Sequence, residues 1–168
     1  MKYPILEKLF EGENPENIFE VGCGVGGFLK DYVESIKNVP VGGIELNPID
    51  LAQAKENFPD YKDNFYVWDA LKPNWPVSDK KYDIVFSIGT LILMPYPEVA
   101  IGEMLRIGKK VILAELQNHN ESYGVINGNY DYGYQYRCAH DYHKQFDRFG
   151  VKVVITQGLF DKSIIKTI

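Results

Sequence analysis

The sequence predicts an α/β fold in which a mostly parallel sheet of seven strands is covered by helices on both faces. Three observations support this prediction. Short apolar runs alternate along the chain with segments whose apolar residues recur at helical spacing. Four glycines crowd together directly after the first apolar run. The last two runs are joined by a short turn, which is typical of an antiparallel hairpin. Alternating strands and helices form parallel sheets, because crossover connections return each strand in the same direction.

The apolar runs predict the strands, and each run is bounded by turn residues or charges. The fourth run, YDIVFSI, is continuous enough to be buried on both faces, as strands of parallel sheets are. The predicted strands span residues 17–21, 39–46, 65–69, 82–88, 109–116, 151–157 and 162–168.

Helices are predicted between the strands, at about residues 28–38, 48–57, 97–107 and 139–149. Asn47 followed by Pro48 is a strong start signal, since asparagine caps helices and proline suits the first turn. Gly150 is the predicted stop of the last helix. Prolines and polar residues in 70–81 predict a loop or single turn as that crossover. Residues 117–138 show no clear periodicity.

Length and composition predict one globular domain over residues 1–168. Apolar residues make up 45% of the chain and charged residues 24%, with a net charge of −5. This acidic balance argues against nucleic acid as a partner, since nucleic-acid-binding surfaces are usually basic. No apolar run reaches 18 residues and the N-terminus resembles no signal peptide, so we expect no membrane partner and a cytoplasmic location. Cys23 and Cys138 lack the spacing of a metal site, and none is expected.

The glycine cluster in FEVGCGVGG satisfies two patterns. Gly22, Gly24 and Gly27 match the GxGxxG pattern of dinucleotide-binding loops, with Glu45 about twenty residues later as a ribose-binding acid. Glu20 and the glycines at 22, 24 and 26 also match a second pattern, in which an acid precedes three alternating glycines. In a doubly wound sheet, this loop lies where ligands bind.

Three features separate the two interpretations. Glu20 would repel a pyrophosphate but would tolerate a ligand that carries an ammonium and a sulfonium. Asp69, in WDAL at the end of the third predicted strand, suits the exocyclic amine of adenine. The remaining chain is too short for the separate substrate domain of most dinucleotide dehydrogenases.

With these motifs, the sequence resembles the class I S-adenosylmethionine-dependent methyltransferases over nearly its whole length. The resemblance implies a Rossmann-like three-layer sandwich with sheet order 3-2-1-4-5-7-6 and S-adenosyl-L-methionine as cofactor. The chain departs from the family pattern after Arg106, where a longer loop is trimmed to IGKK. The matching segments are FEVGCGVGG, GGIELNP, WDAL, YDIVFSIGTLILM and EMLRIGKKVILAEL.

The resemblance also implies roles for individual residues. The glycines let the backbone approach the methionine part of the cofactor, and Glu20 holds its amino group. Glu45 takes the ribose hydroxyls, while Asp69 and the Ala70 backbone contact the adenine. The residues after the fourth strand line the methionine end. The implied cofactor-binding residues are Glu20, Gly22, Gly24, Gly26, Glu45, Asp69, Ala70, Ser87 and Ile88.

The methyl acceptor is less well defined. We expect its pocket to form from the loop after the fourth strand and from residues 117–138, which hold five tyrosines. His119, near the start of that segment, and His140, just after its end, are candidate catalytic bases. The alternative is that the tyrosine-rich segment packs on itself or on a second subunit, as in a homodimer. SIGT replaces the Asn/Asp-Pro-Pro-aromatic motif of nucleic-acid amino-methyltransferases.

The sequence therefore predicts an S-adenosylmethionine-dependent methyltransferase that acts on a small-molecule O- or N-acceptor. One alternative is a binding module that holds the cofactor or its product, S-adenosylhomocysteine, without turnover or with the help of a partner subunit. Another alternative is a nicotinamide-dependent oxidoreductase, against which Glu20 and the chain length argue.

Overall fold

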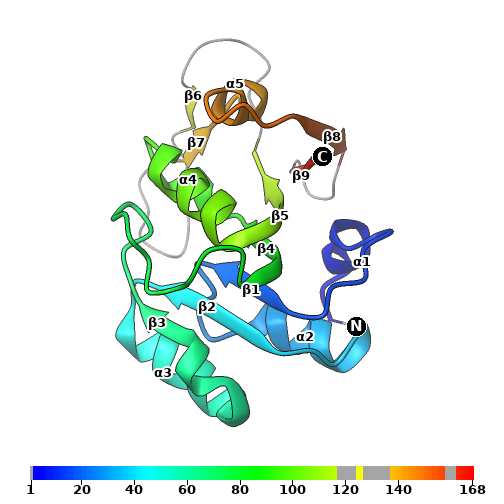
Figure 1. Ribbon diagram of the computed structural model, residues 1–168, viewed down its shortest axis with the longest axis vertical. Coiled ribbons are helices and arrows are strands. Elements are labelled where there is room, and N and C mark those ends of the chain that lie inside the picture. The colour runs from blue at the N-terminus through cyan, green and yellow to red at the C-terminus, as the bar shows by residue number, and fades with distance from the viewer. Residues whose placement is uncertain (1, 117–123, 127–136, 158–161) are drawn as a thin grey trace.

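The computed structural model describes residues 2–116, 124–126, 137–157 and 162–168. Strands and helices alternate through most of these residues (Figure 1). The strands are β1 Ile18–Val21, β2 Val41–Glu45, β3 Phe65–Val67, β4 Tyr82–Ile88, β5 Gly108–Glu115, β6 Gly124–Ile126, β7 Arg137–Ala139, β8 Val153–Gln157 and β9 Ser163–Thr167. The helices are α1 Ile5–Leu9, α2 Gly27–Ser35, α3 Pro48–Asn57, α4 Glu98–Ile107 and α5 Tyr142–Asp147, with 3₁₀ turns η1 Pro59–Asn64 and η2 Leu91–Leu93.

Seven strands form one sheet in the order β3-β2-β1-β4-β5-β9-β8. The first five strands pair in parallel, and β9 is antiparallel to both β5 and β8. This is the predicted order with its C-terminal hairpin, because β8 and β9 are the sixth and seventh strands of the sheet. The parallel register brings the carboxyl ends of β1, β2, β3 and β4 to one edge, where ligands bind in such sheets.

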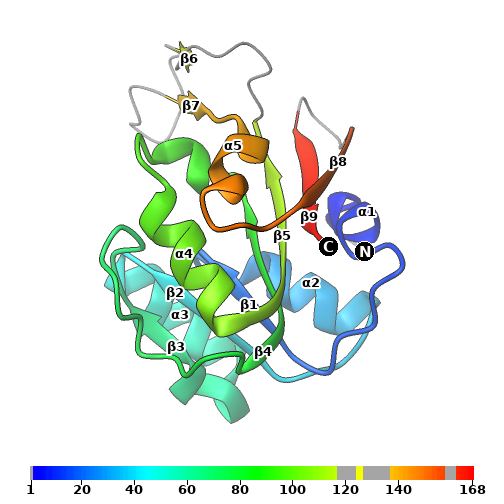
Figure 2. The same cartoon turned by 45° about the horizontal axis from the view of Figure 1, so that its top comes forward.

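Helices cover both faces of the sheet, as predicted (Figures 1 and 2). One core cluster joins α1, α2 and α3 to alternate residues of the strands, among them Ile18 and Ile84. The other cluster joins α4, α5 and the β3–β4 connection to the opposite set, among them Phe19 and Val85. Because side chains alternate across a strand, β1, β2, β4, β5 and β9 each contribute buried residues to both clusters. The short α1 packs against the core through Leu6 and Leu9, both fully buried.

Two helix boundaries show the value of local capping signals. Asn47 caps α3 as predicted, since its side chain accepts a hydrogen bond from the Ile49 amide at 3.0 Å. The prediction for the last helix was too long at its start. Residues 137–139 pair with β6 instead, and α5 begins only after Asp141, whose side chain accepts from the Lys144 amide at 3.2 Å. The two-stranded β6–β7 sheet was not predicted.

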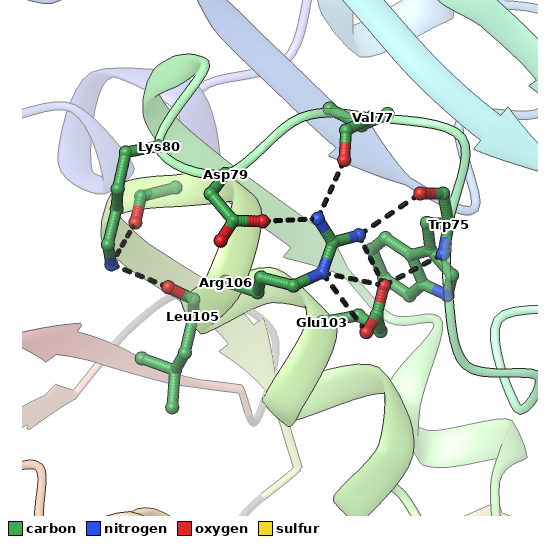
Figure 3. Close-up of polar contacts among 8 residues, drawn as sticks. Trp75, Val77, Asp79, Lys80, Glu103, Leu105 and Arg106 are labelled. Atoms are coloured by element: carbon green, nitrogen blue, oxygen red, sulfur yellow. Dashed lines mark hydrogen bonds and ion pairs between the residues drawn. The ribbon is translucent and has the colours of Figure 1, made fainter.

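The β3–β4 connection contains no helix, as its prolines predict, and Arg106 of α4 holds it in place (Figure 3). The guanidinium donates to the carbonyl oxygens of Trp75 and Val77 at 3.0 and 2.7 Å. It also forms ion pairs with Asp79 at 2.8 Å and Glu103 at 2.6 Å. The planar guanidinium has several donors, so it satisfies carbonyl oxygens of this connection that would bond within the helix if the crossover were helical.

Helix α4 leads directly into β5 after Arg106, where the sequence predicts a short turn. Helix α4 ends at Ile107 and β5 begins at the next residue, Gly108. A side chain at Gly108 would place its Cβ 2.7 Å from Cγ2 of Val85 and 3.0 Å from the Met104 carbonyl oxygen. Glycine is required at this position because the helix end lies directly on the neighbouring strand.

Candidate functional site

The glycine cluster forms a tight loop between β1 and α2. Its first two amides, those of Gly22 and Cys23, both donate to the carbonyl oxygen of Ile44 at 2.9 and 3.0 Å. Gly22, Gly24 and Gly26 all have positive φ angles, of 71°, 52° and 78°. Three left-handed residues in alternation turn the backbone sharply, and only glycine adopts this conformation without strain.

Glu45, at the end of β2, ties this loop to the neighbouring strand. Its Oε2 accepts a hydrogen bond from the Gly24 amide at 3.0 Å, and its Oε1 accepts from the Asn47 amide at 2.9 Å. Each carboxylate oxygen has a second lone pair that these contacts leave available. The half-buried carboxylate can therefore hold the loop and accept further hydrogen bonds from a ligand.

A cavity of about 310 Å³ lies at this edge of the sheet and brings together four of the predicted residues. These are Gly22, Glu45, Asp69 and Ala70. Another side of the cavity is formed by residues that follow β4, including Thr90, Leu93 and Met94. These residues were not predicted as cofactor contacts. The predicted residues come from the ends of three adjacent strands, so the strand order explains why residues up to 48 positions apart share one cavity.

The Asp69 side chain is held in place by the turn that follows β3. Its Oδ1 accepts a hydrogen bond from the Leu71 amide at 3.0 Å, which is the geometry of an Asx turn. Among the described residues, no hydrogen bond reaches its other oxygen. Asp69 is half-buried and lines the cavity, so this oxygen is available to a donor such as an amine.

Glu20 is buried behind the glycine loop with an unsatisfied oxygen. The residue is 1% exposed, and its Oε2 has no hydrogen-bond partner among the residues that the structure describes. Burial raises its pKa well above the ordinary value of 4.5, and the nearby Glu45 carboxylate raises it further. A buried carboxylate with an unpaired oxygen is costly, which marks the position as one that a cationic ligand group would stabilise.

The other five predicted residues, Glu20, Gly24, Gly26, Ser87 and Ile88, are not among the described residues that line this cavity. Ser87 is fully buried, and its hydroxyl donates to Glu115 at 2.8 Å. Ile88 lines a second cavity of about 250 Å³ on the α1–α2 side of the sheet. A Cβ at Gly26 would lie 3.0 Å from the Phe58 ring, so this glycine allows α2 to approach the end of α3.

Sequence reasoning missed Glu115, the last residue of β5. This fully buried carboxylate also accepts hydrogen bonds from the amides of Thr90, Leu91 and Ile92, at 3.0, 3.1 and 3.3 Å. It thereby holds the loop that lines the first cavity. A single acid at the end of an apolar run, ILAEL, was the only signal.

The candidate bases have different outcomes. His140 is 2% exposed, and its Nε2 lies 3.2 Å from the carbonyl oxygen of Leu91. Burial lowers its pKa from the usual 6.5. His119 and the five tyrosines of residues 117–138 lie outside the described residues.

The described part of the chain holds no group of three metal-ligating residues. None of its helices is long and apolar enough to cross a membrane.

A comparison with known protein families identifies the family to which the chain belongs. A family model described as "Methyltransferase domain" matches residues 18–110, more than half of the chain. The chain belongs to this family. The match runs from β1 through the glycine loop, Glu45 and Asp69 to the start of β5, so it contains most of the cavity. With the observed fold, it places the protein among the class I S-adenosylmethionine-dependent methyltransferases, as the sequence motifs indicated.

Two curated relatives of the chain have names that specify different acceptor atoms. A malonyl-[acyl-carrier protein] O-methyltransferase of Ilyobacter polytropus is 36% identical over 87 residues, which are 51% of this chain and 31% of that protein. Norajmaline N-methyltransferase of Rauvolfia serpentina is 32% identical over 117 residues, 66% of this chain and 39% of that protein. The chain thus spans about a third of the length of these relatives.

Solved structures share the fold of this chain at low sequence identity. One is from a complex of the Haloferax volcanii Trm112 methyltransferase activator and a putative methyltransferase, with a TM-score of 0.69, 15% identity and coverage of 91% of this chain and 82% of that one. Another is an O-methyltransferase from a Brevibacillus brevis polyketide synthase with bound S-adenosyl-L-homocysteine, with a TM-score of 0.67, 14% identity and coverage of 90% and 53%.

Proposed function

We propose that this protein uses S-adenosyl-L-methionine to methylate an oxygen or nitrogen atom of a small molecule. The observation that carries the proposal is the cavity at the carboxyl ends of the strands. There the start of the glycine loop and two carboxylates of adjacent strands, Glu45 and Asp69, line one cavity. Glu20 does not line it, but its buried carboxyl is close enough to Glu45 for the two to interact electrostatically.

The residues present fit this cofactor in charge and in hydrogen-bonding capacity. Glu20 would stabilise the ammonium group, since its Oε2 has no hydrogen-bond partner in the described part of the chain. Glu45 would accept from both ribose hydroxyls while keeping its bonds to the Gly24 and Asn47 amides. Asp69 would accept from the adenine amine, and the Ala70 backbone would contact the ring edge. The open space over Gly24, where a Cβ would meet nothing within 4 Å, leaves room beside the loop.

The bound cofactor supplies an activated methyl group on a sulfonium. When it is bound, the acceptor's O or N lone pair would form the new bond to the methyl carbon, and the electron pair of the broken carbon–sulfur bond would stay on sulfur in the neutral thioether product. The chain's own residues hold the reactants in line, and orientation of this kind contributes at most about 7–11 kcal/mol. A hydroxyl acceptor also needs a base to take its proton, an effect of about 10²–10⁴ in rate.

The acceptor class is supported by the two curated relatives, whose names specify O- and N-methylation. Of the candidate bases, His140 has its Nε2 beside the Leu91 carbonyl, within the loop that lines the cavity. Its lowered pKa favours the neutral ring, in which the Nε2 beside this carbonyl oxygen is the donor, so this nitrogen is not the one that takes a proton from the methyl acceptor. Turnover that is unchanged in His140→Ala would remove this residue from the mechanism and leave His119 as the candidate.

The direct test is calorimetric titration of the purified chain with S-adenosyl-L-homocysteine, with NAD as the control. Binding of the thioether and not of NAD is the expected result. Binding of NAD alone would establish the nicotinamide alternative. Binding of neither by the isolated chain would favour the partner-dependent alternative, which the activator complex among the similar structures also motivates.

A further inference from the structure

The second cavity lies on the α1–α2 face of the sheet and has a different composition from the first. Its apolar wall comes from Tyr3 in the N-terminal arm, Phe28 in the first turn of α2 and Ile88 at the end of β4. The Tyr3 and Phe28 rings pack with centroids 4.6 Å apart. The volume of about 250 Å³ is below the range for drug-sized ligands and suits a small molecule.

The arm that carries Tyr3 is fixed over this cavity. The Asp31 carboxylate of α2 accepts hydrogen bonds from the backbone amides of Lys2 and Tyr3, both at 2.7 Å. These contacts use both oxygens of Asp31, so this acid stabilises the wall of the cavity and does not project into it. The aromatic wall is therefore held in place by hydrogen bonds rather than by ring packing alone.

The charged groups of this cavity are both cationic. Lys162, directly before β9, and Lys2 line it, and none of its described lining residues is acidic. The Lys2 ammonium lies 5.3 Å from the centre of the Tyr3 ring. Within the described residues, Lys162 forms no ion pair at 4.0 Å or less. Lys162 interacts electrostatically with Glu115, but this carboxylate already accepts four hydrogen bonds from other groups.

The Lys162 ammonium also lies beside Gly89, the residue that directly follows β4. A Cβ at Gly89 would lie 2.5 Å from the Lys162 Nζ, so the absence of a side chain at Gly89 makes room for the ammonium. Gly89 has a φ of 68°, which only glycine adopts readily. The ammonium therefore lies against the backbone directly after β4.

The two cavities lie on either side of the same two segments, residues 88–90 at the end of β4 and the glycine loop. Ile88 lines the second cavity and Thr90, two residues later, lines the first. Gly22, at the start of the glycine loop, lines the first, while a Cβ at Gly27, at its end, would lie 3.5 Å from the Tyr3 hydroxyl. A ligand that follows the glycine loop from the first cavity therefore has its far end near the second.

We propose that this second cavity binds the methyl acceptor, and that the acceptor is a small carboxylate with an aromatic or apolar body whose anionic group pairs with Lys162. This inference rests on the proposed function, because it assigns the first cavity to the cofactor. A carboxylate matches the cationic lining by a charge-assisted hydrogen bond, and an aromatic body matches the Tyr3–Phe28 wall.

The test compares two probes of equal shape, phenylacetate and phenylacetamide, titrated by NMR into the protein with saturating S-adenosyl-L-homocysteine. Phenylacetate should bind about tenfold tighter, as expected for one charge-assisted hydrogen bond, and should show NOEs to the Tyr3 and Phe28 rings. Lys162→Met should abolish the preference, whereas Lys152→Met, which removes an exposed lysine from outside the cavity, should retain it.

The outcomes separate the two proposals. Equal affinity for the two probes in the wild-type protein, or NOEs to other residues, would overturn the acceptor site while leaving the proposed cofactor intact. Weaker binding of S-adenosyl-L-homocysteine by Lys162→Met would overturn it too, because the lysine would then hold the cofactor's own carboxylate. If the thioether does not bind, the proposed function fails, and the probes titrated alone still report whether the cavity selects an anion.

Discussion

The Glu115 carboxylate and the Ser87 hydroxyl form a buried hydrogen bond of 2.8 Å that joins the ends of β5 and β4. Both residues are fully buried, and they lie 28 positions apart in the sequence. The same carboxylate accepts the three amides that open η2. One side chain therefore connects the core of the sheet to a loop that lines the candidate cofactor cavity.

Glu115→Gln should destabilise the protein by about 1–3 kcal/mol, because an amide accepts fewer hydrogen bonds and leaves buried amides unsatisfied. Urea denaturation checks this, with the exposed Glu34→Gln as the matched control, which should stay within about 0.5 kcal/mol of the wild type. An unfolding midpoint equal to that of the control would show that the buried carboxylate does not hold the loop.

Glu45→Gln should weaken binding of S-adenosyl-L-homocysteine by about tenfold or more, because the side chain loses the charge that attracts the loop amides and the ribose hydroxyls. Calorimetric titration measures the change. Glu56→Gln, on the exposed face of α3, is the control and should bind like the wild type. Equal affinities for both variants would contradict the role of Glu45.

Glu20→Gln should stabilise the protein at neutral pH while weakening thioether binding. The raised pKa means that the folded state binds the Glu20 proton more tightly than the unfolded state. Its stabilising contribution is present below the ordinary value of 4.5 and is lost as the pH rises through the folded-state pKa. Denaturation from pH 4 upward should show a smaller decline in the variant. A variant less stable than the wild type at neutral pH would contradict this account.

Gly22→Ala should destabilise the protein more than Gly12→Ala and should abolish thioether binding. Both glycines are left-handed, with φ of 71° and 76°, so both substitutions incur backbone strain of about 1 kcal/mol. A Cβ at Gly22 would also lie 2.3 Å from the Thr90 Oγ1, whereas nothing lies within 4 Å at Gly12. Thermal unfolding and titration of both variants check the difference. Retained binding in Gly22→Ala would mean that the loop tolerates a side chain beside the ligand.

Arg106→Gln should loosen the β3–β4 connection and cost more stability than Arg148→Gln. Arg106 satisfies two carbonyl oxygens and two acids, whereas Arg148 forms an exposed ion pair with Glu98 of the kind worth about 0–1 kcal/mol. Hydrogen exchange should show the loss of protection at the Val77 amide, which bonds the Trp75 carbonyl at 2.7 Å. Equal unfolding free energies for the two variants would indicate that the connection is held by packing of Trp75 instead.

Much of the fold was predictable because its determinants are local. Alternating apolar runs marked the seven strands of the main sheet, and the Asn47 cap marked the start of α3. The β6–β7 pair was missed, and the last helix was predicted too long, because Ala139 fits a helical pattern but pairs with Gly124. Pairing of residues 15 positions apart depends on tertiary context, which a local pattern does not report.

The sequence by itself determined the seven strands of the main sheet, the glycine loop and the acids at the ends of β1, β2 and β3, since backbone turns and strand ends are encoded by adjacent residues. Only the tertiary structure placed Glu115 against η2, Thr90 over Gly22 and Lys162 against Gly89. These pairs are separated by 24 to 73 positions, and strand order and register decide which of them meet. The physical reason is that pairing between distant strands forms through the collective packing of the core, and no single segment carries that information.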